Sequence, residues 1–162
     1  MDRLWAPWRM EYILSDKSEE CIFCIPEDVT VDRSRLILFA NRHAIIMLNR
    51  YPYSNGHLMV APRLHTNRLD ALTAECQQGM LQALVECQLA LEKVMHPQGF
   101  NVGINLGKAA GAGVDDHLHI HIVPRWEGDT NFMSVIPDVR VMPEYLLVTY
   151  DKLISCFGGE SG

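Results

Sequence analysis

The sequence lacks any long apolar run. No stretch of the 162 residues approaches the about 18 consecutive apolar residues that a membrane-spanning helix needs. The opening residues MDRLWAPWRMEYILS also lack an apolar segment of the length found in signal peptides. We therefore expect a soluble cytoplasmic protein with no membrane partner.

Basic charge is also scarce. The chain has 14 Lys and Arg against 20 Asp and Glu, which gives a formal net charge of -6. A general nucleic-acid binder carries a basic patch, so we expect no nucleic-acid partner. A small phosphorylated ligand stays compatible with this charge, because a few cationic groups and backbone amides suffice for a local anion site.

Cysteines are few, and their number, five, is odd. Cys76 and Cys87 fall in a helical pattern and look like core residues. Cys21 and Cys24, in CIFC, have the spacing with which two thiolates hold zinc or close a redox disulfide. A thioredoxin-type pair would follow a strand, and nothing before Cys21 predicts one. Zinc is therefore favoured, with unliganded thiols as the alternative.

Short apolar runs bounded by turn or polar residues predict five strands, at 36–40, 44–48, 58–61, 100–106 and 118–123. Pro52 and the Asn55-Gly56 pair favour a hairpin-like reversal between the second and third. Apolar residues at 80, 81, 84, 85, 91, 94 and 95 predict a helix over 73–95, capped by Thr73. A shorter helix is expected within 143–157.

This order of strands and helices predicts an α+β fold with a mostly antiparallel sheet. A chain of 162 residues can bury one good core, so we expect a single domain over 1–162. It would comprise an N-terminal segment with CIFC (1–30), a core of sheet and long helix (31–126), and a tail with the last helix (127–162).

The stretch DDHLHIHIVPRW at 115–126 places histidines at every other position, His117, His119 and His121. In a strand this spacing puts the imidazoles on one face and the aliphatic residues between them on the other. We expect the aliphatic row to face a core and the histidine row to face something polar. The imidazoles could ligate a catalytic metal, with Asp115 or Asp116 nearby, or act in phosphoryl chemistry.

The preceding GKAAGAG at 107–113 favours phosphoryl chemistry. Glycines let backbone N–H groups approach an anion, and Lys108 adds a positive charge. A flexible loop between strands is the alternative.

With these residues in view, the chain closely resembles the histidine triad (HIT) superfamily of nucleotide hydrolases and transferases. The signature His-φ-His-φ-His-φ-φ is complete at 117–123, and the similarity extends to CIFC, AIIMLNRYPYSNGHLMVAPRLH and NVGINLGKAAGAG. WAPWR and RWEGDTNFM are similar to the bacterial diadenosine tetraphosphate phosphorylase-like branch, close to the fragile-histidine-triad group. The resemblance implies a HIT-like fold, a nucleotide substrate and a homodimer.

The resemblance also implies residue roles. His119 would attack the α-phosphorus and form a nucleotidyl-histidine, and His121 would contact the phosphate and hold the geometry of the nucleophile. Asn49 would contact the ribose, with His57 near the same pocket. The phosphate path would be lined by Asn105, Lys108 and the amides of Gly111 to Gly113. Structural zinc would be held by Cys21, Cys24, His65 and His117, and His117 would also belong to the catalytic set with His119 and His121.

Two expectations concern the chemistry. An attacking imidazole needs a neutral nitrogen, and a carbonyl bonded to its other nitrogen fixes that tautomer; we expect such a partner for His119 in the middle of a strand. Hydrolytic relatives often carry Gln or Ser shortly before the first histidine, whereas GAGVDD has neither. The space left by Gly113 favours inorganic phosphate as acceptor, hence phosphorolysis of diadenosine tetraphosphate to ADP and ATP.

Three alternatives stay open. The first is hydrolysis of dinucleoside polyphosphates or nucleoside phosphoramidates, with water as the acceptor. The second is a zinc-stabilised nucleotide-binding protein with little turnover. The third is a metallohydrolase that uses the three histidines as ligands.

Overall fold

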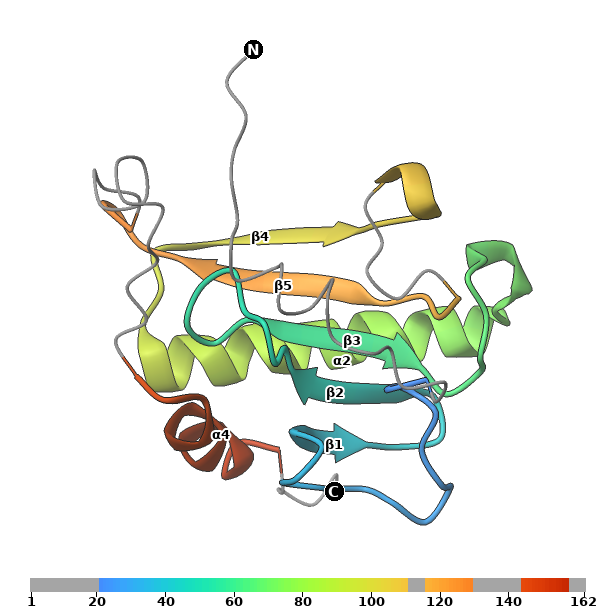
Figure 1. The fold of residues 1–162 in the computed structure, drawn as a ribbon, viewed down its shortest axis with the longest axis horizontal. Helices are drawn as coiled ribbons and strands as arrows, with labels where there is room; N and C mark the ends of the chain where they lie inside the picture. Colours follow the sequence, from blue (N-terminus) through green and yellow to red (C-terminus); the bar gives the residue numbers. More distant parts are fainter. Residues whose placement is uncertain (1–20, 111–115, 130–143, 158–162) are drawn as a thin grey trace.

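The computed structural model describes residues 21–110, 116–129 and 144–157 (Figure 1). Its centre is a five-stranded sheet in the order β1-β2-β3-β5-β4, in which every neighbouring pair is antiparallel. The strands are β1 (Ile37–Ala40), β2 (Ala44–Leu48), β3 (Leu58–Pro62), β4 (Gly99–Ile104) and β5 (Ile120–Arg125). The predicted α+β class and antiparallel sheet are confirmed.

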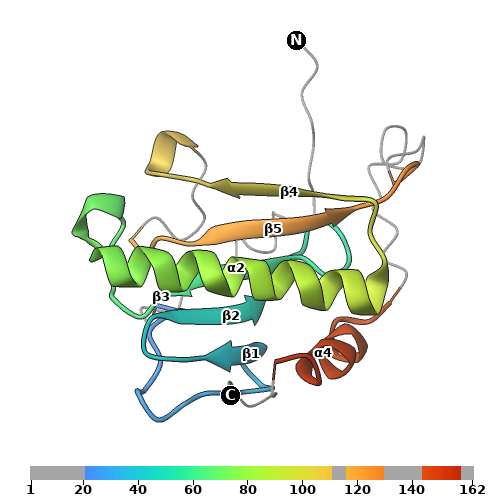
Figure 2. The ribbon, with the colours of Figure 1, turned by 180° about the vertical axis from the view of Figure 1, so that it is seen from behind.

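The long helix α2 (Ala74–Met95) lies across one face of the sheet, as Figure 2 shows most clearly. The Thr73 hydroxyl accepts a hydrogen bond from the Cys76 N–H at 3.2 Å, as the N-cap prediction requires. The helix ends at Met95, and the C-cap residue His96 has left-handed backbone geometry with φ 49°. The shorter helix α4 (Leu146–Ile154) lies beside β1, and two 3₁₀ turns, η1 (Leu69–Ala71) and η2 (Lys108–Ala110), follow β3 and β4. Among the described helices, none combines the length and apolarity needed to cross a membrane.

The turn after β2 follows the prediction. Residues 49–57 connect two antiparallel strands, and Gly56 takes a positive φ of 78° that side-chain-bearing residues rarely adopt. A Cβ at Gly56 would also lie 2.6 Å from the Met95 sulfur. The backbone conformation therefore favours glycine at this position, and a larger residue would also have to displace the flexible Met95 side chain.

The sheet has apolar side chains on both faces. On the α2 face lies the helix-side core, which includes Leu118 and Ile122, two members of the predicted aliphatic row. On the opposite face lies a second core, formed by Phe23, Ile37, Ala40, Ile45, Met47, Met59 and Ala61. Part of the segment 21–29 packs against it. Burial on both faces explains why β2 and β3 are buried at every position.

Two of three expectations about detail are wrong. The fifth strand begins at Ile120, because the Leu118 N–H donates to the Thr66 carbonyl and not to a sheet partner; His119 therefore precedes the strand. The histidine row is largely buried, since His117 and His119 are only 1% and 4% exposed, but it meets polar groups as expected: His117 Nδ1 faces the Cys21 and Cys24 thiols, and His121 faces His57. On α2, Leu81 and Val85 are exposed, and the buried positions are Met80, Ala83, Cys87, Ala90 and Leu91.

Candidate functional site

A cluster of two cysteines and two histidines joins the N-terminal segment to the sheet. Its members are Cys21, Cys24, His65 and His117, and one ligand atom from each lies within 4.8 Å of the other three. We call this set the metal cluster. Cys21 Sγ lies 3.3 Å and Cys24 Sγ 3.8 Å from His117 Nδ1, and Cys24 Sγ lies 3.2 Å from His65 Nδ1.

The cluster fits a tetrahedral metal. Zinc bonds of about 2.3 Å to sulfur and 2.0–2.1 Å to nitrogen place tetrahedral ligand atoms roughly 3.3–3.8 Å apart. The three sulfur–nitrogen distances of 3.2, 3.3 and 3.8 Å lie close to this spacing, and all four ligand atoms lie within 4.8 Å of one another. His117 Nε2 lies 2.8 Å from the Pro62 carbonyl, which can only accept, so the ring proton sits on Nε2 and the Nδ1 lone pair points to the cysteines. Desolvation lowers the pKa of His117, which keeps the ring neutral and able to bind metal.

His119 has the tautomer of a nitrogen nucleophile. Its Nδ1 lies 2.9 Å from the His117 carbonyl oxygen, so Nδ1 donates and Nε2 carries the lone pair. Burial lowers the pKa of His119 because it disfavours the imidazolium, and the hydrogen bond to His117 only partly opposes this shift. His119 is therefore neutral at pH 7. The expected carbonyl partner is present, although it lies two residues back in the segment before the strand.

His121 receives its proton position from His57. The Tyr53 N–H donates to His57 Nδ1 at 3.1 Å, and the Asn49 amide nitrogen lies 3.4 Å from the same atom. Nδ1 of a neutral His57 is thus an acceptor, and its Nε2–H donates to His121 Nδ1 at 2.9 Å. His121 then carries its own proton on Nε2. The His119 and His121 rings meet edge to face, with centroids 4.8 Å apart. The Nε2 lone pair of His119 and the Nε2–H of His121 therefore belong to neighbouring rings.

Two aromatic rings that the sequence did not single out flank these histidines. Phe23 stacks on His119, with centroids 5.0 Å apart and planes at 29°. Tyr53 stacks on His57, with centroids 4.9 Å apart and planes at 30°. The position of Phe23 between the two cysteines of CIFC was the only local signal for it.

The residues predicted to contact the ribose and the phosphates lie in the turn after β2 and at one end of β4. Asn49 is engaged in the β2–β3 turn, where its Oδ1 also accepts the Tyr51 N–H at 2.9 Å. Ile104 pairs with Ile120, so Asn105 and His119 occupy the next positions at the same end of β4 and β5. Lys108 lies further along, in η2, and is exposed.

Beside His121, the pairing residue on β4 is Gly103. A Cβ built on Gly103 meets no atom of the described residues within 4 Å, so this face of the strand is open next to the imidazole. Asp116 is exposed. Gly111, Gly113 and Asp115 lie outside the described residues.

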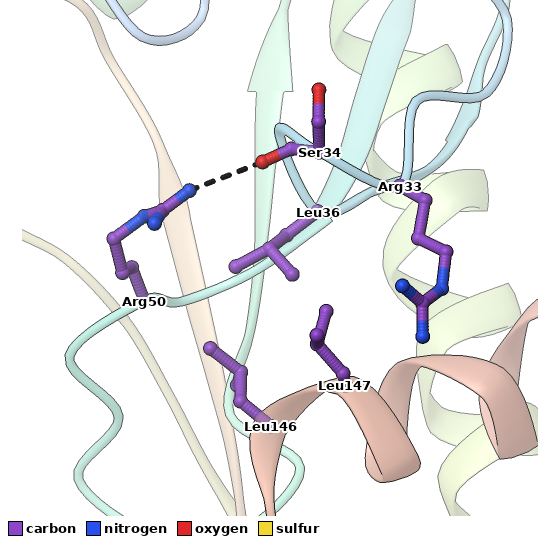
Figure 3. A pocket seen from close by; sticks show the side chains of 6 residues that line it. All are labelled: Arg33, Ser34, Leu36, Arg50, Leu146 and Leu147. Carbon is purple, nitrogen blue, oxygen red and sulfur yellow. Dashed lines mark hydrogen bonds between the residues drawn. The ribbon is translucent and has the colours of Figure 1, made fainter.

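A pocket of 470 Å³ lies elsewhere, between α4, the residues before β1 and Arg50, two residues past the end of β2 (Figure 3). Its lining is formed by Arg33, Ser34, Leu36, Arg50, Leu146 and Leu147. Arg33 forms a bidentate pair with Asp151, and Arg50 donates to the Ser34 carbonyl at 3.2 Å. None of the candidate site residues that the structure describes lines this pocket.

Fold and site together define a class of protein: an antiparallel α+β domain that presents a neutral, buried imidazole next to a proton-donating one, with a Cys2His2 cluster behind them. The HIT domain family model matches residues 32–128. The chain is 37% identical over 157 residues to the AP-4-A phosphorylase of Mycobacterium tuberculosis. This alignment covers 90% of this chain and 79% of the relative. The chain belongs to the HIT domain family.

Solved structures of relatives have the same fold. A Zn-bound histidine triad family protein from Mycobacterium smegmatis is 28% identical, with a TM-score of 0.61 over 75% of this chain and 82% of that one. A Hit-like protein from Bartonella henselae has a TM-score of 0.62 at 23% identity, over 75% of this chain and 86% of that one.

Proposed function

We propose that this protein is a nucleotidyl-transferring enzyme that cleaves dinucleoside polyphosphates, with diadenosine tetraphosphate and inorganic phosphate as substrates and ADP and ATP as products. The observation that carries the proposal is the tautomer of His119, whose hydrogen bond to the His117 carbonyl leaves a lone pair on Nε2. The AP-4-A phosphorylase activity named for the mycobacterial relative supports this choice of substrate.

The reaction would proceed in two displacements. Nε2 of His119 attacks an α-phosphorus, an N–P bond forms, the bond from that phosphorus to the bridging oxygen breaks, and ATP leaves with the bridging oxygen. An oxygen of inorganic phosphate then attacks the same phosphorus, the N–P bond breaks, and ADP is released. His119 returns to its starting state.

His121 would donate from Nε2 to a phosphoryl oxygen during both steps. The bond from His57 holds that proton in place, so the donor is set before the substrate arrives and needs no reorganisation. Asn49 would contact the ribose, and Asn105, Lys108, Gly111 and Gly113 would line the path of the phosphates.

The metal cluster would hold structural zinc. Bound there, zinc would tie the 21–24 loop to His65 and His117 and so support the backbone carbonyl that orients His119.

Product analysis tests the reaction type. Incubation with diadenosine tetraphosphate is expected to give ADP and ATP, and only when inorganic phosphate is present. AMP and ATP in both conditions would make water the acceptor and would contradict phosphorolysis. Tight AMP or ADP binding without any turnover would instead favour a nucleotide-binding protein.

We also propose that the enzyme is a homodimer. On α2, Leu81, Val85 and Leu89 follow one another at helical spacing and are 61%, 42% and 59% exposed, and the edge strand β4 exposes Val102. Apolar rows of this kind are typical of protein interfaces.

Sedimentation tests the dimer. Leu89→Glu is expected to shift the protein toward monomer at micromolar concentration, because a charge in an apolar interface would lose its water. The matched control is Leu69→Glu, another exposed leucine outside the α2 row. A wild-type protein that sediments as a monomer would contradict the proposal.

A further inference from the structure

Phe23 connects the metal cluster to the nucleophile. It lies between Cys21 and Cys24 and is only 1% exposed, as a member of the second core. Its ring touches both histidines of interest, with centroids 5.0 Å from His119 and 5.2 Å from His117. An aromatic side chain this deeply buried at the centre of a short loop fixes where that loop can lie.

The contact with His119 restrains the imidazole in a way that its hydrogen bond does not. The bond from Nδ1 to the His117 carbonyl fixes one edge of the ring, but the ring can still tilt about that bond. Phe23 stacks against one face at 29° and opposes that tilt. Attack on phosphorus requires the Nε2 lone pair to point along the line of displacement. A tilted His119 ring would therefore react more slowly.

The loop itself is held at several points. The Arg35 guanidinium donates to the carbonyls of Ile22, at 3.3 Å, and Cys24, at 3.1 Å, on either side of Phe23. The Cys24 N–H donates to the Cys21 carbonyl at 3.1 Å. Both thiols then face the ring nitrogens of the metal cluster, so a metal bound there would fix the loop from its two ends.

We propose that Phe23 is a positioning residue for the His119 imidazole, and that a metal in the Cys21–Cys24 loop holds Phe23 against it. This inference rests on the proposed function, because it assigns Phe23 a role toward the nucleophile of that reaction. It gives the metal cluster an effect on catalysis through packing, with no contact between metal and substrate.

Kinetics provide the first test. Phe23→Leu keeps an apolar side chain but removes the flat ring, and is expected to lower kcat for diadenosine tetraphosphate roughly tenfold to a hundredfold while KM changes by less than about threefold. The matched control is Phe157→Leu, a phenylalanine 8% exposed in the helix-side core, which is expected to keep the wild-type kcat. Equal kcat for wild type and Phe23→Leu would overturn the proposal.

Nuclear magnetic resonance provides a test that needs no turnover. In the zinc-loaded protein, the ring current of Phe23 is expected to shift the carbon-bound protons of the His119 ring upfield, and Phe23→Leu should remove that shift. Chelation of zinc from the folded wild type should reduce the shift, and added zinc should restore it. A shift that does not respond to zinc would overturn the metal's part in the proposal.

The two tests separate this inference from the proposed function. If the wild type turns over no dinucleotide, the proposed function fails, yet the proton shifts still report whether Phe23 and the metal position His119. If Phe23→Leu does not fold, the wild-type spectra with and without zinc decide. If His119 proves essential but neither kcat nor the shifts respond to Phe23→Leu, only the inference fails.

Discussion

Replacing His119 with asparagine is expected to lower turnover of diadenosine tetraphosphate by at least roughly 10³-fold while the protein stays folded. The asparagine amide nitrogen takes the place of Nδ1, which donates to the His117 carbonyl at 2.9 Å, so the local hydrogen bond survives. What disappears is the Nε2 lone pair, and with it the N–P bond on which both displacements depend. Intact-protein mass spectrometry after a brief incubation should show a nucleotidyl adduct on wild type and none on the variant.

The control for this substitution is His96→Asn. His96 is exposed at the end of α2 and has left-handed geometry, which asparagine tolerates well. It is expected to keep wild-type turnover. An adduct that forms on His119→Asn would place the nucleophile elsewhere and would contradict the proposed mechanism.

The pH dependence of wild-type activity tests the role of His119 in a second way. Burial lowers the pKa of His119 below the ordinary 6.5. Protonation therefore removes the Nε2 lone pair, and with it the nucleophile, only when pH falls through that lowered pKa. The acid limb of kcat/KM is therefore expected below pH 6.5, with activity retained as pH rises above it. An acid limb well above pH 7 would mean that a different group is titrating.

Local patterns were enough to predict most of the fold. Apolar runs identified the five strands because each strand is a short run of mostly apolar residues, buried throughout in β2 and β3 and more exposed in the edge strand β4. Thr73 marked the start of α2 by its capping hydroxyl. The Asn55-Gly56 pair marked the turn because glycine adopts the positive φ of that position without strain. These signals depend on residues within a few positions of one another, so they are readable from the chain alone.

The second core was not predictable in the same way. The alternation of His117, His119 and His121 predicts that they share a face, but it contains no information about what covers that face. Over His117 and His119 the cover is Phe23 with its neighbours in the segment 21–29, which is distant in sequence and held there by long-range bonds. Arg63, for example, donates to the carbonyls of Pro26 and Val29 at 2.8 and 2.9 Å.

Within the site, the proton positions are the part that the sequence could not supply. The bond between His57 and His121 joins residues 64 positions apart and depends on the register between β3 and β5, which pairs Met59 with His121. The tautomer of His119 depends on a carbonyl in the segment before β5, whose conformation follows from the bond between Leu118 and Thr66. Residue types suggested the chemistry, and only the tertiary fold assigns each nitrogen as donor or acceptor.

Cys24→Ser is expected to remove stoichiometric zinc and to lower the melting temperature by roughly 10 °C. A ligand present at about a thousand times its Kd stabilises the folded state by about 4 kcal/mol, and each kcal/mol shifts the melting temperature of a chain this size by about 2–4 °C. Burial, the largest cause, and the neighbouring Cys21 raise the pKa of the Cys24 thiol in the absence of metal. A bound cation reverses this preference, because it binds the thiolate and releases the proton.

Metal analysis and thermal unfolding together check this prediction, with and without a chelator. The matched control is Cys76→Ser, because a serine hydroxyl can still donate to the His43 carbonyl that the Cys76 thiol faces at 3.6 Å. We expect that control to keep its zinc and most of its stability. The proton release sets the sign of the pH effect: zinc should be lost more easily as pH falls, since protons then compete for the thiolates and for His65 and His117. If Cys24→Ser binds zinc as wild type does, or if chelation leaves the wild-type melting temperature unchanged, the four residues are not a structural zinc site.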